Sequence, residues 1–506
     1  MPLLTERYAK QIVGVLSCYD RLVIMGTLPG LCYADGMASY LRAHDIRLFD
    51  LPRFAEPLRD EIRQNAERLA QEAGLEIEFI RSAKAFRKDD RLREILGERG
   101  DAPGLVHIFS AMEPCTSFEP WHDKKTGKTF LRSKDAKCLH YYFYFLDPEF
   151  GLCYLRVPTW APFRLQFYCN GHNWLAGKLR EAGITFTQLD NTFVTLADFA
   201  RAQELADTFP VERLHRLLDR VALQFCPVLS YFETRYHWSL MQVEYATDIV
   251  FRRQQDLRPL YDTLVRTAVH AVKPEHVATF LGRKVHPLYQ DELGNDFHTR
   301  IEGTRIKHHM GPVAIKMYDK QALVLRLETT VNEVSFFKHH RKVEHKDGTS
   351  DTQLAPMQKT IYSLGALREL LTAANRRYLA FLSDLLDPSG GVKKVEKLAA
   401  PARKDDRTYR GFNPFAKEDL DLFVALCRGE WQISGFQNRG LRRALPEKTG
   451  AQISRLLKRL HVHGLIRKVG RTYKYYLTKF GQDVVLTALK LRELVVIPAL
   501  AGVPAA

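Results

Sequence analysis

The first hundred residues alternate short apolar runs with amphipathic segments. The apolar runs predict strands at 21–28, 45–51, 75–82 and 104–111. Apolar residues at helical spacing predict helices at 35–44, 57–74 and 89–100. Because strands separated by helices favour parallel neighbours, we expect residues 1–105 to form an α/β domain.

The pattern changes to aromatic strands after residue 105. "CLHYYFYFLDPEFGLCYLRVPTW" has two strand-like runs around a turn at 148–151 and predicts a β-hairpin. We assign 106–225 to an aromatic-rich α+β segment and 226–385 to an α+β domain with a β unit at 300–332. The body is therefore expected to be multidomain, of the α/β or α+β class.

Residues 386–412 are rich in Pro, Gly and charge and lack periodicity, which predicts a linker. A separately folded unit is expected at 413–495, followed by a tail at 496–506. Within this unit, "KEDLDLFVALCRG", "FQNRGLRRAL" and "GAQISRLLKRLHVHG" predict three helices, and "LIRKV" and "KYYLT" predict two strands around the turn "GRT". Three helices followed by a basic β-wing are typical of a winged helix-turn-helix.

The third helix separates into an apolar stripe and a polar face. The stripe contains Ile453, Leu456, Leu457 and Leu460. The polar residues, which we expect to face outward, are Gln452, Ser454, Arg455, Lys458 and Arg459.

The stretch "ISRLLKRLHVHGLIRKVGRTYKYYLTKFGQDV" resembles the winged-helix domains of MarR-type transcriptional regulators. "GLI" leads into the wing, and the residues "LT" and "G" lead into the final helix. The resemblance covers residues 415–485 and implies a C-terminal winged helix-turn-helix with DNA as its ligand.

Charge independently points to a polyanion. The chain of 506 residues has a net charge of +16, and residues 431–480 contain twelve Lys or Arg against Glu447 alone, a net charge of +11. DNA is the expected partner, while RNA and protein contact remain alternatives. In such folds the third helix enters the major groove and the wing meets phosphate or the minor groove. The expected contacts are Arg439, Arg442, Arg443, Gln452, Ser454, Arg455, Lys458, Arg459, Arg471 and Lys474.

The remaining composition predicts a cytoplasmic protein without a membrane partner. The sequence has no apolar run of about 18 residues and no signal-peptide pattern at its start. Its eight cysteines form no CxxC pair, which argues against a zinc ribbon or a disulfide framework. A zinc site built from Cys115, Cys138, His122 and His140 stays open. The oligomeric state is not determined by the sequence, and a dimer is compatible with it.

A polar ridge is predicted on the β unit at 313–331. Strand alternation places Lys316, Tyr318 and Lys320 on one face of the first strand. Arg326 and Glu328 share a face of the second. This ridge can be a solvated face with cross-strand charge pairs, a contact to nucleic acid through Lys316 and Lys320, or a catalytic site in which Tyr318 acts.

"IKMYDK" followed by "VLRLETTV" resembles a strand pair of phage and rolling-circle plasmid replication initiators. Those proteins cleave DNA with a nucleophilic tyrosine and a His-hydrophobic-His metal motif. "IKHHMG" and "CLHYYFYF" depart from that motif, which puts nicking activity in doubt.

Two further segments carry candidate chemistry. Glu113, Glu119, Asp123 and Asp147 can form a carboxylate set for Mg²⁺ or Mn²⁺, although "DKKTGK" is also typical of a surface turn with Gly127 at the bend. His172 is a candidate general base at a helix start, where Asn173 can be the helix N-cap. No cofactor is certain.

These observations predict a nucleic-acid-binding protein, in the first place a DNA-processing protein of a mobile or plasmid-like element that is initiator-like or transposase-like. A large winged-helix transcriptional regulator with a sensing or oligomerising body is the first alternative. An RNA-binding or RNA-guided component is the second. Whether the body is an enzyme is left open.

Overall fold

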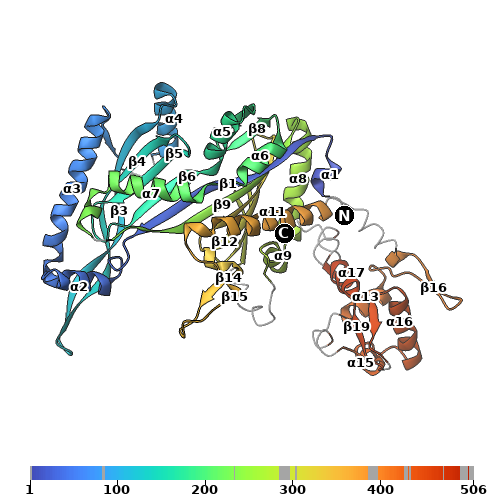
Figure 1. The fold of residues 1–506 in the computed structure, drawn as a ribbon. Helices are drawn as coiled ribbons and strands as arrows, with labels where there is room; N and C mark the ends of the chain where they lie inside the picture. The colour runs from blue at the N-terminus through green and yellow to red at the C-terminus, as the bar shows by residue number, and fades with distance from the viewer. Residues whose placement is uncertain are drawn as a thin grey trace. The chain divides into compact units, whose positions relative to one another are not determined.

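The computed structural model describes residues 3–81, 86–232, 234–283, 297–302, 305–385, 397–426, 431, 435–470, 472–490 and 500. The chain divides into two compact units, unit 1 at Met1–Leu386 and unit 2 at Asp387–Ala506 (Figure 1). Each unit is described separately below. None of the described helices combines the length and the apolar character that a membrane span needs.

Unit 1 is built on one mixed sheet of eleven strands. In their spatial order the strands are β10 (Phe297–Glu302), β11 (Arg305–Met310), β12 (Val313–Lys320), β13 (Val324–Val331), β9 (His237–Phe251), β1 (Ile12–Thr27), β6 (Leu165–Asn170), β5 (Gly151–Pro158), β4 (Lys128–Asp147), β3 (Gly104–Asp123) and β2 (Ile77–Phe79).

The sheet differs from the prediction in two ways. The expectation of parallel neighbours holds for β2 and β3, which flank α4 in the chain, but it is wrong for β1 and for the rest of the sheet, where the neighbours are antiparallel. The three expected body domains also contribute strands to a single sheet, because β1 pairs with both β6 and β9. Long-range pairing of this kind leaves no signal in local hydrophobic periodicity.

Helices pack around this sheet. They are α1 (Leu4–Arg7), α2 (Ala34–Ala43), α3 (Leu51–Glu72), α4 (Lys88–Arg99), α5 (Gly171–Glu181), α6 (Phe199–Ala206), α7 (Val211–Phe225), α8 (Gln254–Ala271), α9 (Pro274–Phe280) and α11 (Leu364–Leu385). The expected strand at 45–51 is wrong, because a 3-10 turn at Leu48–Asp50 leads directly into α3. Two small hairpins complete the unit, formed by β7 (Phe186–Leu189) with β8 (Thr192–Leu196) and by β14 (Lys338–Glu344) with β15 (Ser350–Pro356).

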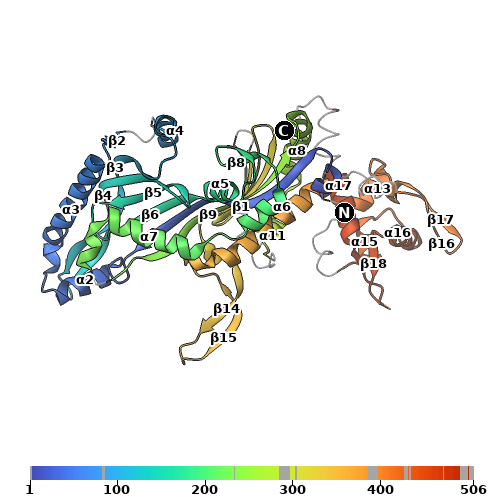
Figure 2. The same ribbon diagram turned by 45° about the horizontal axis from the view of Figure 1, so that its top comes forward.

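The two faces of the sheet differ in chemistry. Alternation sends Phe143, Leu155 and Phe167 into the main hydrophobic core, where Phe143 stacks on Phe225 of α7 at 4.6 Å between ring centroids. On β9 and β13 the same core face packs against α11. Figure 2 shows α7 and α4 on opposite sides of the strands β3 to β6. The face turned away from this core carries the polar residues considered next.

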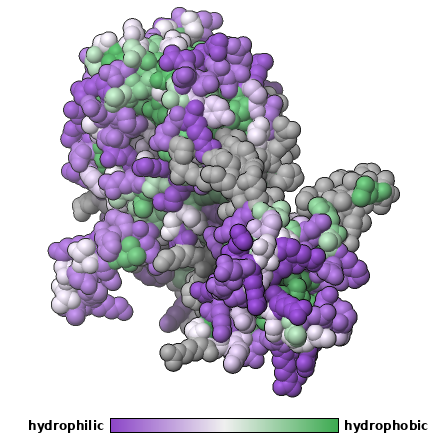
Figure 3. All heavy atoms as spheres, turned by 90° about the vertical axis from the view of Figure 1, so that its right-hand side faces the viewer, coloured by the Kyte–Doolittle hydropathy of each residue, from purple (hydrophilic) through white to green (hydrophobic). Residues whose placement is uncertain are grey.

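Unit 2 contains the predicted local elements in the predicted order. They are α13 (Lys417–Leu426), α15 (Asn438–Ala444), α16 (Gly450–Val462), β18 (Ile466–Lys468), β19 (Tyr475–Leu477) and α17 (Lys479–Lys490). A separate hydrophobic core joins them, to which α16 contributes Ile453, Leu457 and Leu460. Hydrophilic side chains cover much of the unit 2 surface seen in Figure 3.

The predicted linker at 386–412 is not extended throughout. Residues 386–396 lie outside the described part, but β16 (Ala402–Lys404) and β17 (Arg407–Tyr409) form a hairpin that belongs to unit 2. The charge-rich composition that suggested a linker therefore belongs to an exposed hairpin. Most of the predicted tail at 496–506 also lies outside the described residues.

Candidate functional site

A β-bulge in β1 begins the site. Tyr19 pairs with Tyr245 and Leu22 with Val243, so Asp20 and Arg21 together oppose the single residue Glu244 of β9. Bulges re-aim side chains and are frequent beside active sites. Here the bulge lies at the centre of the sheet and contributes Asp20 and Arg21 to the same cavity.

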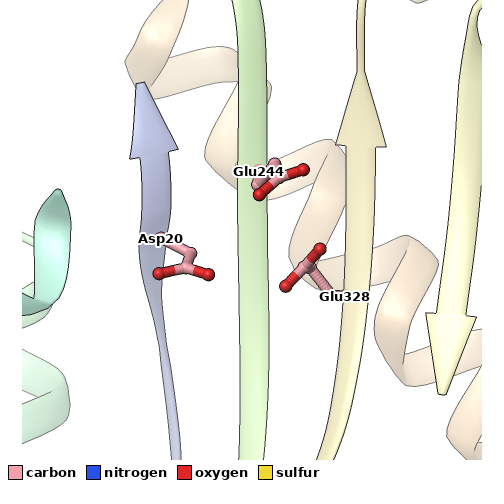
Figure 4. A group of neighbouring side chains, drawn as sticks. All are labelled: Asp20, Glu244 and Glu328. Atoms are coloured by element: carbon pink, nitrogen blue, oxygen red, sulfur yellow. The ribbon is translucent and has the colours of Figure 1, made fainter. Parts of the chain in front are cut away.

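Three carboxylates converge beside this bulge. Asp20 of β1, Glu244 of β9 and Glu328 of β13 each offer an oxygen, and these oxygens lie within 4.8 Å of one another. Figure 4 shows the three side chains coming from neighbouring strands and pointing toward one another. Asp20 and Glu328 are buried and Glu244 is half-buried. This is the one group of potential metal ligands found among the described residues.

A buried arginine, Arg326, lies beside these carboxylates and contacts several polar side chains. The Arg326 guanidinium donates to both oxygens of Asp248 at 2.6 Å and to Asp20 at 3.1 Å. Its Nη2 also lies 3.2 Å from Nε2 of His172, and His172 Nδ1 lies 3.2 Å from Asp20. The guanidinium is shared by the two carboxylates, which makes burial of these charges tolerable.

The pKa values in the cluster follow from these contacts. Burial alone would raise the pKa of Asp20 and Asp248, but Arg326 and His172 outweigh it and lower both well below the usual range. Burial alone would lower the pKa of His172, but Cys18 and the two aspartates raise it well above 6.5. Both aspartates are therefore ionised at neutral pH.

The predicted polar ridge forms the opposite side of the site. Strand alternation placed these residues on shared faces, and the register brings the two faces together, with Lys316 opposite Glu328 and Tyr318 opposite Arg326. Lys316 Nζ donates to Glu328 at 2.6 Å and to Glu244 at 3.1 Å, and the Tyr318 hydroxyl donates to Glu328 at 2.5 Å. The ridge is thus mainly an internal ionic network, and the interpretation of it as a solvated face is wrong.

Burial changes what the ridge residues can do. Lys316 is only 6% exposed and engaged by two carboxylates, so its predicted contact to nucleic acid is wrong. Lys320 is half-buried and donates to Asn191; burial and then Arg326 lower its pKa to about 8. Burial and Glu328 raise the pKa of Tyr318, so its hydroxyl keeps its proton.

Two connected cavities lead to the carboxylates. One of about 460 Å³ is lined by Asp20, Glu244 and Arg21 at the bulge and by Asp89 of α4. The other, of about 500 Å³, lies over β4 and β5. The two share the lining residues Arg21, Asp89, Leu92, Leu152 and Tyr168.

The carboxylate set predicted from the aromatic segment is not formed. Glu113, Glu119 and Asp123 follow one another along β3, where ten residues of strand span about 33 Å. Each carboxylate has its own partners nearby: Arg156 and Tyr142 for Glu113, Arg132 and Lys134 for Glu119, the turn residues Lys125 and Thr126 for Asp123, and Arg220 for Asp147. The prediction of a metal site at these four residues is wrong, because "DKKTGK" is the tip of the β3–β4 hairpin.

His172 and the zinc candidates also need correction. Asn170, rather than Asn173, caps α5 by accepting from the His172 backbone N–H at 2.8 Å. His172 itself is only 1% exposed within the Arg326 cluster, so it is not placed to take a proton from a substrate. His140 lies near Cys138, with 3.8 Å between Nδ1 and Sγ, whereas the exposed His122 bonds to Thr129, so the four zinc candidates form no common ligand group.

In unit 2, most of the predicted contact residues are exposed around α16. Gln452, Ser454, Arg455 and Lys458 lie on the exposed side of this helix, and Arg439, Arg442, Arg443 and Lys474 are also exposed. Arg471 lies outside the described residues. The exposed α16 residues line a cavity of about 880 Å³ together with Arg407 and Arg410 from the β16–β17 segment.

Arg459 is an exception. It is only 6% exposed, pairs with Asp419 of α13 at 2.7 Å, and donates to the backbone oxygens of Arg410 and Gly411. The expectation that Arg459 faces outward is wrong. This arginine ties α16 to α13 and to the end of the hairpin segment.

Sequence reasoning missed Asp20, Glu244, Asp248 and the partner role of Arg326. One signal was available, since "LSCYDRLVIM" and "VEYATDIVF" place isolated charges inside apolar strands. Charges in such runs are buried and must be paired. Which charge pairs with which could not be read, because their strands lie far apart in the sequence.

In comparisons with known proteins, no family model and no curated protein matches the chain.

Proposed function

We propose that the chain is a DNA-processing protein of a mobile or plasmid-like element, in which unit 2 binds DNA and unit 1 carries out metal-dependent phosphodiester chemistry. The observation that carries this proposal is the convergence of Asp20, Glu244 and Glu328 from three adjacent strands beside an open cavity. Clustered carboxylates are what phosphoryl-transfer sites use to hold hard cations.

The residues fit Mg²⁺ or Mn²⁺ in donor chemistry, since all three offer carboxylate oxygens. A bound ion would stabilise negative charge on a phosphoryl oxygen. Lys316 already bridges Glu244 and Glu328, so cation binding requires its ammonium to move aside. Asp20 and Glu244 line the cavity and would be the first to meet an entering ion.

Tyr318 is the proposed nucleophile. Its hydroxyl donates to Glu328, which can take the proton as attack proceeds. In that step an Oη–P bond forms, the P–O bond to the leaving nucleotide breaks, and the leaving oxygen acquires a proton from solvent. The product would be a covalent tyrosyl–DNA ester.

For unit 2 we propose a winged helix-turn-helix in which α16 is the reading helix and the β18–β19 hairpin is the wing. The order of its elements and the exposed cations on α16 support this proposal. Arg455 and Lys458 would contact phosphate or base edges, and Gln452 and Ser454 base edges.

A transcriptional regulator is the second candidate, and one observation favours it. Each of the three carboxylates already has a cationic partner, Arg326 for Asp20 and Lys316 for Glu244 and Glu328. Carboxylates that are paired in this way can serve only to hold the sheet together. In that case unit 2 would bind DNA and unit 1 would sense a ligand or oligomerise.

A cleavage assay with the full chain separates the two. Supercoiled and single-stranded DNA that carry the sequences flanking the chain's own gene are incubated with Mn²⁺ or Mg²⁺. We expect cleavage that stops in EDTA and falls by about 100-fold or more in Glu244→Gln, as for other lost electrostatic catalysts. Glu119→Gln, which alters an exposed ion pair on β3, is the matched control and should cleave normally.

Tyr318→Phe should abolish any covalent protein–DNA adduct on a denaturing gel. Urea unfolding of each variant separates loss of chemistry from loss of fold. If the wild-type chain binds this DNA but cleaves it with neither metal, the regulator is supported and the enzyme is rejected.

A further inference from the structure

The sheet face that holds the carboxylates continues as a strip of tyrosines. Tyr144 of β4 pairs in register with Tyr154 of β5, and Tyr154 with Tyr168 of β6. The Tyr154 and Tyr168 rings are stacked, with 5.1 Å between centroids and 14° between planes. Both rings are half-buried and line the connected cavities, so part of their surface faces open space.

Cations accompany this strip. Arg21, exposed at the bulge, lies over the Tyr168 ring at 5.4 Å and lines both cavities. Lys88 of α4 lies 3.1 Å from the Tyr142 ring centroid at the far end. Arg93, also on α4, is exposed at the cavity nearer the carboxylates.

The acidic groups along the strip do not cancel these cations. Glu113 is neutralised by Arg156 at 2.7 Å. Arg93 is paired with Asp90 at 3.2 Å, which leaves Asp89 and Asp190 in the lining of the two cavities against Arg21, Arg81 and Lys88.

We infer that this strip, from Tyr154 through Tyr168 to Arg21, is a binding track for single-stranded DNA that leads a phosphodiester to Asp20 and Glu244. Aromatic faces bind unpaired bases by stacking, and a flanking row of cations follows the backbone. Paired bases bury their faces inside the duplex, so the tyrosines select for single strands. The inference rests on the proposed function and names its substrate class.

Lys88 supplies a pH signature for the track. Burial lowers the pKa of Lys88 to about 8. Glu113 and Asp89 oppose this shift, and Arg156 adds to it. A phosphate beside it favours the charged form, so its contribution to binding should be complete below about pH 8 and lost as the pH rises above that value. Lys88→Arg should keep that contribution at pH 9, because guanidinium stays charged.

Photo-crosslinking tests the track locally, without interference from DNA bound to unit 2. The full chain in EDTA is irradiated with a short oligo-dT that carries 5-iodouracil, and the crosslinked peptides are mapped by mass spectrometry. We expect crosslinks at Tyr154 or Tyr168. Tyr168→Leu should lower the crosslink yield and the oligo-dT affinity by about 10-fold, while Tyr168→Phe should retain both.

Tyr33→Leu, which removes an exposed tyrosine outside the track, is the matched control. Arg21→Met provides a second test if Tyr168→Leu fails to fold, and it should weaken oligo-dT binding and lower its salt dependence. The inference would be overturned by crosslinks that are confined to unit 2 or by an unchanged affinity in both variants. Stronger binding of oligo-U than of oligo-dT, or equal competition by a duplex, would also overturn it.

The two proposals fail separately. A crosslink at Tyr168 without metal-dependent cleavage would leave the track standing and reject the proposed chemistry. Cleavage that is unaffected by Tyr168→Leu and Arg21→Met would reject the track alone.

Discussion

The charged face of unit 1 and the exposed face of α16 in unit 2 both carry Lys and Arg, but these cations are buried in unit 1 and exposed on α16. In unit 1, Arg326 and Lys316 are buried and each contacts two carboxylates. In unit 2, Arg455 and Lys458 are exposed on α16. A buried cation surrounded by carboxylates neutralises those carboxylates and cannot contact a ligand. An exposed cation on a basic surface remains available to a polyanion.

The strongest test of this contrast is the same substitution made on each side. Arg326→Met leaves Asp20 and Asp248 buried without their main cation, and should lower the free energy of unfolding by about 3–5 kcal/mol. Arg455→Met should change it by less than about 0.5 kcal/mol. Urea unfolding followed by circular dichroism measures both, and equal losses would contradict the contrast.

The converse test is DNA affinity at several salt concentrations. Arg455→Met and Lys458→Met should each weaken DNA binding, and should lower the slope of log affinity against log salt by about 0.9 for each phosphate that is no longer neutralised. Arg258→Met, an exposed arginine on α8, is the control and should leave the slope unchanged. Fluorescence anisotropy provides the measurement, and an unchanged slope in both α16 variants would remove this face as a DNA contact.

The smallest expected effect is the response of unit 1 to acid. Because the folded pKa of Asp20 and Asp248 lies below the unfolded value of 3.8, their contribution to stability is present above about pH 4. It is lost as the pH falls below that value. The urea midpoint should therefore drop between pH 5 and pH 3, and drop less in Asp248→Asn. Parallel pH profiles for the two chains would show that Asp248 does not contribute.

Local pattern was enough to predict several parts of the fold. Alternation gave the polar faces of β12 and β13 on which Lys316 and Glu328 lie, and the "DKKTGK" turn was recognised from its residues. The helices around α16 were also predicted, because their apolar stripes pack within one short segment. Each of these features is decided by residues close together in the chain.

The centre of the site depends on residues that are distant in sequence. Asp20 and Arg326 are 306 positions apart, and their contact requires the β1–β9–β13 order of strands. Arg459 shows the same limit on a smaller scale. Helical spacing placed it on the outward polar face, and only the position of Asp419 on α13 decides that it turns inward.

The bulge at Asp20 and Arg21 sets the phase of β1. Tyr19, just before it, reaches the core face and donates to the backbone of Leu364 at the start of α11, while the pair after it serves the charged face. Substitution at either bulge position changes one side chain. Deletion of either residue would leave one residue opposite Glu244 and restore regular pairing, with Tyr19 and Leu22 still on the core face. The extra residue is therefore what allows β1 to present two neighbouring polar side chains, Asp20 and Arg21, to the same cavity while the strand keeps its phase on both sides.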